Sequence, residues 1–165
     1  MSRRLGRFGL CVAATCWLAL VPSARGTDQE AVAALQKLGG LSARAGSDSE
    51  ASVIKVEFNR AALTDEKLEE AVGHMQKLNS LRAVTLGFTK VTDAGLVHLA
   101  GLPELEELGL AQTAVTDAGL PHLKGLKKLK RLDLAGTKVT DKGAADLKAA
   151  LPALDITRGP ALRKN

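Results

Sequence analysis

The chain repeats one segment with a period of 24 residues between positions 81 and 143. The sequence LRAVTLGFTKVTDAGL at 81–96 returns at 105–120 as LEELGLAQTAVTDAGL, and begins again at 129 as LKRLDLAGTKVTDKG. A fixed period in the range of roughly 20–50 residues is typical of repeat proteins, in which each unit packs only against its neighbours. The sequence therefore predicts a solenoid made of stacked units.

Earlier and later parts of the chain fit the same frame. Val53 begins a divergent first unit, because it lies 11 residues before Thr64, just as Leu81 lies 11 residues before Thr92. This first unit has 28 residues, and the four extra ones lengthen its helix by about one turn without rotating its buried face. The predicted repeat domain covers 53–157, with units at 53–80, 81–104, 105–128 and 129–150, a partial unit at 151–157, and a flexible tail at 158–165.

Within each unit, a short strand is followed by a helix. Leu81, Val84 and Leu86 are apolar at positions one, four and six, so we expect them to face the core. Positions three, five and seven then face the opposite way. Thr92 and Asp93 place a hydroxyl and a carboxylate at the start of the helix, where free backbone N–H groups need acceptors.

Threonine recurs at position nine of the units, as Thr89, Thr113 and Thr137. We expect each hydroxyl, at the turn after the strand, to bond to the backbone of its own or the neighbouring unit. Such bonds would link the units into a ladder. A threonine that faces solvent is the alternative interpretation.

The first 26 residues differ in character from the repeats. Arg3, Arg4 and Arg7 precede an apolar run at 10–21, and small residues follow it around Ala24 and Gly26. This order is typical of a secretory signal peptide, cleaved after Ala24 or after Gly26. The apolar run holds about 12 residues, whereas roughly 20 are needed to cross the hydrocarbon core. We therefore predict a signal peptide at 1–26 and an exported protein, periplasmic or secreted, with an uncleaved N-terminal membrane anchor as the alternative.

The full chain has 23 basic and 18 acidic residues, but the predicted signal peptide contains four of the arginines and no acid. Without it the balance is 19 to 18, so no basic patch for nucleic acid is expected. Cys11 and Cys16 also lie in this segment, and the rest of the chain has no thiol for a disulfide, a metal or a nucleophile. The composition thus predicts no nucleic-acid partner, and membrane contact only through an uncleaved N-terminus.

Residues 27–52 lie between the signal peptide and the first unit. Val32, Leu35 and Leu38 fall at helical spacing within 28–38, and Gly39 and Gly40 stop that helix. We expect this helix to cap the stack, because terminal repeats need a polar outer face. Residues 41–52 show no periodicity and are predicted to form a loop.

Candidate catalytic and metal-binding residues recur with the repeat. His74, His98 and His122 are 24 residues apart and are expected in a column on neighbouring helices. Helices pack about 8–10 Å apart, too far for three imidazoles to share a zinc ion with bonds of roughly 2.1 Å. Acids such as Asp65 and Asp93 are explained by helix starts, and copies of one position lack the different environments of an acid–base pair. We predict a non-enzymatic protein without metal or cofactor.

The unit L-x-x-L-x-L-x-x-T-x-V-T-D-x-G-L resembles the leucine-rich repeat, in the form found in small exported bacterial proteins with threonine in place of the usual asparagine. The resemblance covers residues 28–157. It implies an α/β solenoid of about four to five coils, with short parallel strands on the concave face and α-helices on the convex face. It also implies a role in recognition, since the family binds many unrelated partners and shares no common chemistry.

The concave face is the candidate binding surface, because outward residues of stacked parallel strands form columns. Position three provides one column, Lys55, Ala83, Glu107 and Arg131, and position five another, Glu57, Thr85, Gly109 and Asp133. Position eight adds Phe88 as an aromatic anchor, in a column with Arg60, Gln112 and Gly136. The predicted partner-binding residues are Lys55, Glu57, Thr85, Phe88, Glu107, Gln112, Arg131 and Asp133.

Two interpretations of this face remain open. In the first, it binds a protein or peptide, or a cell-envelope polymer or glycan, and the protein is a monomer. In the second, pairs such as Glu107–Arg131 and Glu106–Lys130 are ordinary cross-strand ion pairs on a solvated face. The protein would then be a structural component held in the envelope by its N-terminal helix.

Overall fold

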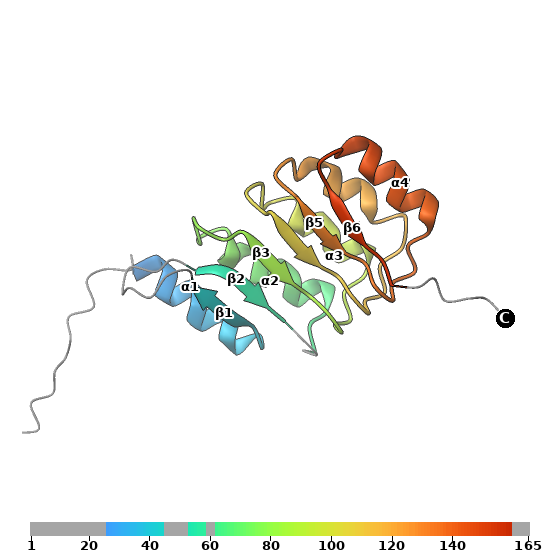
Figure 1. The fold of residues 1–165 in the computed structure, drawn as a ribbon. Helices are drawn as coiled ribbons and strands as arrows, with labels where there is room; N and C mark the ends of the chain where they lie inside the picture. Colours follow the sequence, from blue (N-terminus) through green and yellow to red (C-terminus); the bar gives the residue numbers. More distant parts are fainter. Residues whose placement is uncertain (1–25, 45–52, 59–61, 160–165) are drawn as a thin grey trace, which may run out of the picture.

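The computed structural model describes residues 26–44, 53–58 and 62–159. The predicted signal peptide (apart from Gly26), residues 45–52 of the predicted loop, residues 59–61 with Arg60 of the predicted column, and the end of the tail lie outside these residues. The described part forms one sheet whose strands follow each other in chain order, with the helices packed along one side (Figure 1). The elements are α1 (Gly26–Lys37), β1 (Leu41–Arg44), β2 (Val53–Glu57), α2 (Asp65–Met75), β3 (Ala83–Thr85), α3 (Asp93–Leu99), β4 (Glu107–Gly109), the 3₁₀ helix η1 (Leu120–Gly125), β5 (Arg131–Asp133), α4 (Asp141–Ala150) and β6 (Asp155–Thr157).

Strands β2 to β6 are parallel, and their register is the one that the 24-residue period predicts. Ala83 pairs with Lys55 on one side and with Glu107 on the other, and Glu107 pairs with Arg131. Arg131 in turn pairs with Asp155 in the partial unit. The register confirms the predicted columns, and the sheet with its helices confirms the predicted α/β solenoid.

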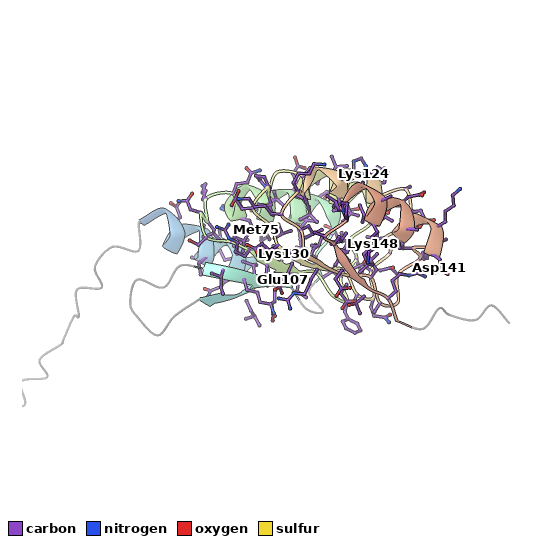
Figure 2. All side chains as sticks on the ribbon, turned by 45° about the horizontal axis from the view of Figure 1, so that its top comes forward. Met75, Glu107, Lys124, Lys130, Asp141 and Lys148 are labelled. Atoms are coloured by element: carbon purple, nitrogen blue, oxygen red, sulfur yellow. The ribbon has the colours of Figure 1, made fainter. Side chains whose placement is uncertain are left out.

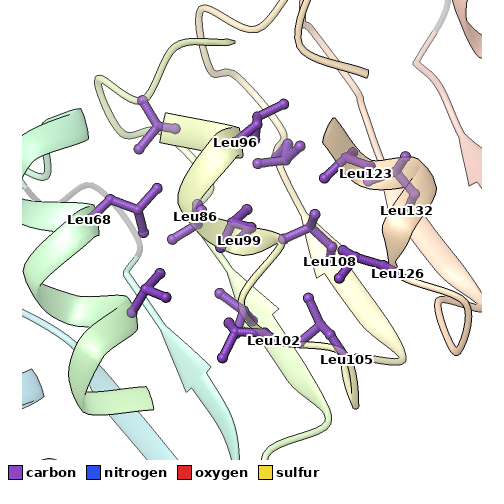
Figure 3. Packing of buried hydrophobic residues seen from close by; sticks show 14 of the residues in the cluster. Leu68, Leu86, Leu96, Leu99, Leu102, Leu105, Leu108, Leu123, Leu126 and Leu132 are labelled. Carbon is purple, nitrogen blue, oxygen red and sulfur yellow. The ribbon is translucent and has the colours of Figure 1, made fainter. Parts of the chain in front are cut away.

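Leucine and valine side chains fill the space between sheet and helices (Figure 3). Leu81, Val84 and Leu86 are buried, as positions one, four and six of the unit were expected to be. Leu105, Leu108 and their counterparts one coil later pack in the same layers. Each coil therefore covers the apolar face of the previous one, which is how a chain with so few aromatic residues builds a continuous core.

The predicted loop at 41–52 is wrong over its first four residues. Leu41–Arg44 forms strand β1, which runs antiparallel to β2 and pairs Leu41 with Glu57. The outer edge of β2 would otherwise leave unpaired backbone N–H and C=O groups, and β1 covers that edge. The segment gave no strand pattern because an edge strand is held by backbone hydrogen bonds rather than by an apolar face.

The helix of the third repeat unit (105–128) also differs from expectation, because η1 is a 3₁₀ helix rather than an α-helix. Pro121 occupies the repeat position that Val97 occupies in α3. Proline has no N–H to donate to the carbonyl four residues earlier, and its ring collides with that carbonyl. The helical segment of the third unit therefore begins with a turn and continues as a 3₁₀ helix.

Aspartate and threonine at the helix starts link each coil to the next. Oδ1 of Asp65 accepts a hydrogen bond from the backbone N–H of Thr92 at 2.8 Å, and Oδ2 accepts one from its hydroxyl at 2.7 Å. The pattern returns one coil on, where Asp93 accepts from Thr116 at 2.7 and 2.6 Å. We expected these aspartates to cap their own helices, but they bond to the next coil instead. The threonines contribute the caps, as when the Thr92 hydroxyl accepts from the N–H of Ala94 at 3.3 Å.

The threonines at position nine close turns within their own coils. The hydroxyls of Thr89, Thr113 and Thr137 donate to the carbonyl oxygen three residues earlier, at 2.7, 2.7 and 2.8 Å. Bonding within the unit was one of the two predicted possibilities. The ladder between coils is therefore made at the helix starts and not at this position.

The same aspartates explain why glycine follows two residues later in the repeat. A Cβ atom on Gly95 would lie 2.5 Å from Oδ1 of Asp65, and one on Gly119 would lie 2.5 Å from Oδ1 of Asp93. Real Cβ atoms do not approach so closely, so the position has room only for glycine. In the first unit the corresponding residue is Lys67, which is exposed.

Replacing Gly119 with alanine should lower the free energy of unfolding by about 1–3 kcal/mol, because the added methyl group displaces the Asp93 carboxylate. Gly73→Ala is the matched control, since a Cβ atom on this residue in the last turn of α2 would meet nothing within 4 Å. That control should stabilise the protein by about 0.5–1 kcal/mol. Urea denaturation of the two variants measures both changes, and equal effects would contradict the assignment.

Acid should weaken the last link of the ladder. Hydrogen bonds from the hydroxyl and from the backbone N–H of Thr140 lower the pKa of Asp117 below its ordinary value. A group whose pKa is lower in the folded state stabilises the fold above its unfolded pKa, and this contribution disappears as the pH falls below about 4. Thr140→Val should therefore raise the pKa of Asp117 toward the ordinary value, as measured by carboxyl NMR titration. The hydroxyl of Thr137 donates to the carbonyl of Leu134 instead, so Thr137→Val should leave the pKa of Asp117 unchanged.

Candidate binding face

The sheet side of the solenoid has a shallow hollow of about 250 Å³. It spans β2 to β6, so every parallel strand contributes to it. The residues that line it are Lys55, Ala83, Val84, Thr85, Glu107, Leu108, Gly109, Arg131, Leu132, Asp133 and Thr157. Five of the eight predicted binding residues are brought together here: Lys55, Thr85, Glu107, Arg131 and Asp133.

Small residues make the floor of this hollow. Ala83 and Gly109 lie at positions three and five of neighbouring strands, where the other units carry longer side chains. A Cβ atom on Gly109 would lie 3.0 Å from Cγ2 of Thr85, so the methyl group of Thr85 fills part of the space that glycine leaves. The depth of the hollow therefore comes from residues whose side chains are short, with the charged ones standing around them.

Two ion pairs flank the floor. Lys55 Nζ lies 2.5 Å from Oε1 of Glu57 within β2, and Arg131 pairs with Glu107 across β4 and β5. The second is the cross-strand pair that the register predicts. Arg131 keeps 69% of its side chain exposed, so pairing leaves its guanidinium accessible. Exposed pairs of this kind contribute about 0–1 kcal/mol each, and a partner could displace them at little cost.

Asp133 is held more firmly than its neighbours. Its Oδ1 accepts a hydrogen bond from the backbone N–H of Ala135 at 2.9 Å, which fixes the carboxylate at the end of β5. Oδ2 has no hydrogen-bond donor among the described residues. A half-buried carboxylate with one oxygen committed and one available is suited to accept a hydrogen bond from a donor on a ligand.

Phe88 and Gln112 lie beyond the strand ends rather than in the hollow. Both have left-handed backbone conformations, with φ of 59° and 56°, and Gly136 at the same repeat position has φ of 70°. The N–H of Phe88 donates to the carbonyl of Ala111 at 2.9 Å, and that of Gln112 to Ala135 at 2.7 Å, so the turn is fixed by the next coil. A left-handed conformation costs a residue other than glycine about 1–2 kcal/mol. Gly136 was the one signal for this strain in the sequence.

The partial unit adds residues that sequence reasoning missed. Thr157 lines the hollow and Asp155 extends column three, because β6 pairs with β5 in the same register as the other strands. Glu57 lies outside the hollow, bonded to Lys55. The signal that could have placed Thr157 was its distance of 24 residues from Asp133.

A second line of charges runs along the edge where the strands begin. Arg82 lies 3.3 Å from Glu104 and 3.7 Å from Glu106. On the next coil, Lys128 lies 2.7 Å from Glu104 and Lys130 lies 2.6 Å from Glu106. The Glu106–Lys130 pair was predicted. Hydrogen bonds from Lys128 and from Lys130 lower the pKa values of Glu104 and Glu106, respectively. The sign of the charge alternates from coil to coil, so these pairs align the units, and the five charges sum to only +1 (one Arg and two Lys against two Glu).

The histidine column gives no arrangement suited to a metal. His74 and His98 are half-buried and His122 is exposed, and Nδ1 of His74 has no hydrogen-bond partner among the described residues. Within residues 26–44, 53–58 and 62–159, no three His, Cys, Asp or Glu side chains are grouped as metal ligands would be. In the same ranges, no helix has the length and apolar character needed to span a membrane.

Comparison with known proteins agrees with the geometry. Residues 125–148 match the family described as leucine-rich repeat. The units at 81 and 105 carry the same pattern, and all of them build one parallel sheet. Residues 125–148 thus carry a leucine-rich repeat, and the described part of the chain folds as a solenoid of units with the same pattern. Proteins of this class are generally non-enzymatic recognition modules, so family and fold together support a protein-interaction repeat domain.

Solved structures match parts of this chain at low identity. A leucine-rich-repeat protein of Leptospira interrogans matches with 21% identity and a TM-score of 0.40, over 51% of this chain and 21% of that one. An internalin of Listeria monocytogenes matches with 18% identity and a TM-score of 0.39, over 55% of this chain and 31% of that one. The repeat ectodomain of a receptor kinase from Arabidopsis thaliana gives 14%, a TM-score of 0.44, and coverage of 80% and 91%. The match thus spans about a fifth to a third of the first two proteins. No curated protein matches this chain.

Gly136→Ala should lower the free energy of unfolding by about 1–2 kcal/mol, because alanine is strained at a φ of 70°. The new methyl group would also meet the side chain of Gln112. The same substitution in a Gln112→Ala background separates the two causes, and most of the loss should remain there. Gly125→Ala, whose Cβ meets nothing within 4 Å, should change stability by less than about 0.5 kcal/mol in a thermal or urea melt.

Proposed function

We propose that this protein is an exported, non-enzymatic recognition module that binds a peptide or a protein loop on the sheet side of its solenoid. The observation that supports this most directly is the hollow of about 250 Å³ over Ala83 and Gly109. Its floor is made of short side chains, and groups of both signs stand around it. Outward strand positions that served only to stack the coils would not need to differ in side-chain size and charge from one repeat unit to the next.

Size argues for a small ligand on this face. Five parallel strands at about 4.8 Å spacing give a surface roughly 20 Å across. A protein interface of ordinary size buries about 800 Å² on each side, more than a strip of this width supplies with its shallow hollow. An extended peptide or a single loop fits, and main-chain amides would find acceptors in Asp133 and Glu107.

Phe88 stands beside the hollow as the aromatic contact. Its side chain is 54% exposed and its backbone is held in a strained conformation by the next coil. Residues in strained conformations persist where the surrounding structure fixes them, and they concentrate at binding sites. Phe88 and Arg131 are therefore the residues whose loss should weaken binding most.

The test uses a displayed library of random peptides of about 12 residues as the probe. The immobilised protein should enrich a family of peptides. The double variant Phe88→Ala/Arg131→Ala should bind them at least about tenfold more weakly, because both removed side chains are exposed anchors. Fluorescence anisotropy with a labelled peptide measures the affinities. The matched control is Lys77→Ala/Lys127→Ala, which removes two exposed side chains from the turns that lead into β3 and β5, at the other ends of the strands.

Equal affinity of the double variant and the wild-type protein would overturn the assignment to this face. Failure to enrich any peptide would overturn the peptide as the ligand class and would leave a glycan or other envelope polymer for the same assay. Circular dichroism of each variant confirms that the solenoid is intact before binding is compared.

Export rests on the sequence of residues 1–26, with basic residues, an apolar run and small residues in the order of a signal peptide. Mass spectrometry of the N-terminus decides between export and the alternative of an anchored structural protein. A first residue near Thr27 supports cleavage. An intact Met1 or Ser2 in the membrane fraction supports the anchor.

A further inference from the structure

The helix side of the solenoid separates its charges by position. The outward residues Glu66, Glu69 and Glu70 on α2 are exposed, and none of them makes an ion pair with another described residue. At the other end, Lys124 on η1 and Lys142 and Lys148 on α4 are likewise exposed and make no ion pair within the described part of the chain. These two groups, called here the acidic end and the basic end, lie on the same convex face.

The separation extends to the whole described chain. Residues 62–119 contain nine acidic and four basic residues, a formal charge of −5, and residues 120–159 contain nine basic and four acidic residues, a formal charge of +5. The remaining described ranges, 26–44 and 53–58, are neutral. A near-zero net charge therefore conceals two opposite halves, and a net charge near zero removes the repulsion that keeps copies apart.

The basic end has a groove of about 270 Å³ between η1 and α4. Lys124 and Lys148 occupy the same repeat position one coil apart, and Lys124 and Lys142 line the groove. Asp117 and Asp146 also line it, and Asp117 is already bonded to Thr140 at 2.7 and 2.6 Å. Figure 2 shows Lys124 on the helix side of the molecule, away from Glu107 on the sheet side.

Between the two ends the convex face is apolar. Ala94, Val97 and Ala100 follow each other at helical spacing on the outward side of α3, and all three are exposed. Val97 is 47% exposed, one of three large hydrophobic residues left open to solvent among the described residues. Ala118 and Pro121 continue this uncharged surface toward η1. An exposed apolar stripe between regions of opposite charge is typical of a surface that another protein covers.

We infer that the convex face is the interface of a symmetric homodimer. With a two-fold axis near Val97, every contact between a residue of one copy and a residue of the other occurs a second time with the two copies exchanged. The acidic end on α2 then faces the basic end of the second copy twice over, and the two α3 stripes cover each other at the centre. The second copy is the occupant because this chain itself presents the complementary charges in reverse order on one face.

The arrangement leaves both sheet sides open and pointing away from each other. The inference therefore does not depend on the proposed peptide binding, and each can fail without the other. Exposed ion pairs dominate the periphery of the interface, so the dimer should be sensitive to salt.

The test reverses charges in two variants and mixes them. Lys124→Glu/Lys142→Glu/Lys148→Glu makes both ends acidic, and Glu66→Lys/Glu69→Lys/Glu70→Lys makes both ends basic. The protein is purified in the form that the expressing cells accumulate. Sedimentation velocity at low ionic strength should then show a dimer for the wild-type chain. Each variant alone should dissociate at least about tenfold more readily, and the equimolar mixture should form the dimer again.

The control is Lys90→Glu/Lys127→Glu/Lys138→Glu, which changes the net charge by the same amount in loops outside the convex face and should dimerise as the wild type does. Val97→Asp places a charge near the axis and should abolish dimerisation, and circular dichroism verifies its fold. A wild-type chain that remains monomeric at low ionic strength overturns the inference. So does a dimer that persists in both charge-reversed variants, or a mixture that does not associate.

Discussion

Contact between successive coils carries this structure, because a coil of 24 residues has no core of its own. Three sets of interactions make that contact: the parallel strand ladder, the leucine layers, and the two hydrogen bonds that an Asp carboxylate accepts from the threonine of the next coil. The carboxylate bonds set the distance at the helix side, as the strands set it at the sheet side. Glycine two residues later follows from the same requirement, since the incoming carboxylate occupies the place of its Cβ.

The period predicted most of the fold because stacking repeats a local rule. The inward and outward residues, the register and the longer helix of the first unit all follow from counting 24 residues. Strand β1 did not follow, because an edge strand is defined by the neighbour it pairs with. The 3₁₀ helix could have been predicted from Pro121, whose missing N–H is visible in the sequence. The role of the aspartates could not, since a helix cap and a link between coils use the same residue at the same place.

The candidate site was predictable in its columns and less so in its shape. Knowing that Lys55, Glu107 and Arg131 share a column does not say that Ala83 and Gly109 leave a hollow among them. The left-handed turns at Phe88 and Gln112 are fixed by hydrogen bonds to the next coil, which the residue types do not reveal, although Gly136 shows what that position prefers. Charge segregation on the helix side was lost in the net charge, which sums over halves of opposite sign.

The Asp-to-Thr link also has a direction. In each inner coil, the threonine and glycine at the helix start contact the carboxylate of the coil before, and the aspartate contacts the coil after. In the first unit Lys67 stands at the glycine position, and in the last full unit Asp141 pairs with Arg158. The inner units are therefore interchangeable, and the terminal ones are marked by single residues. A gene encoding such a chain could gain or lose a coil by in-frame duplication or deletion of 24 codons, without any compensating substitution at the junction. The length of the solenoid, and with it the reach of its sheet side, is open to evolution one unit at a time.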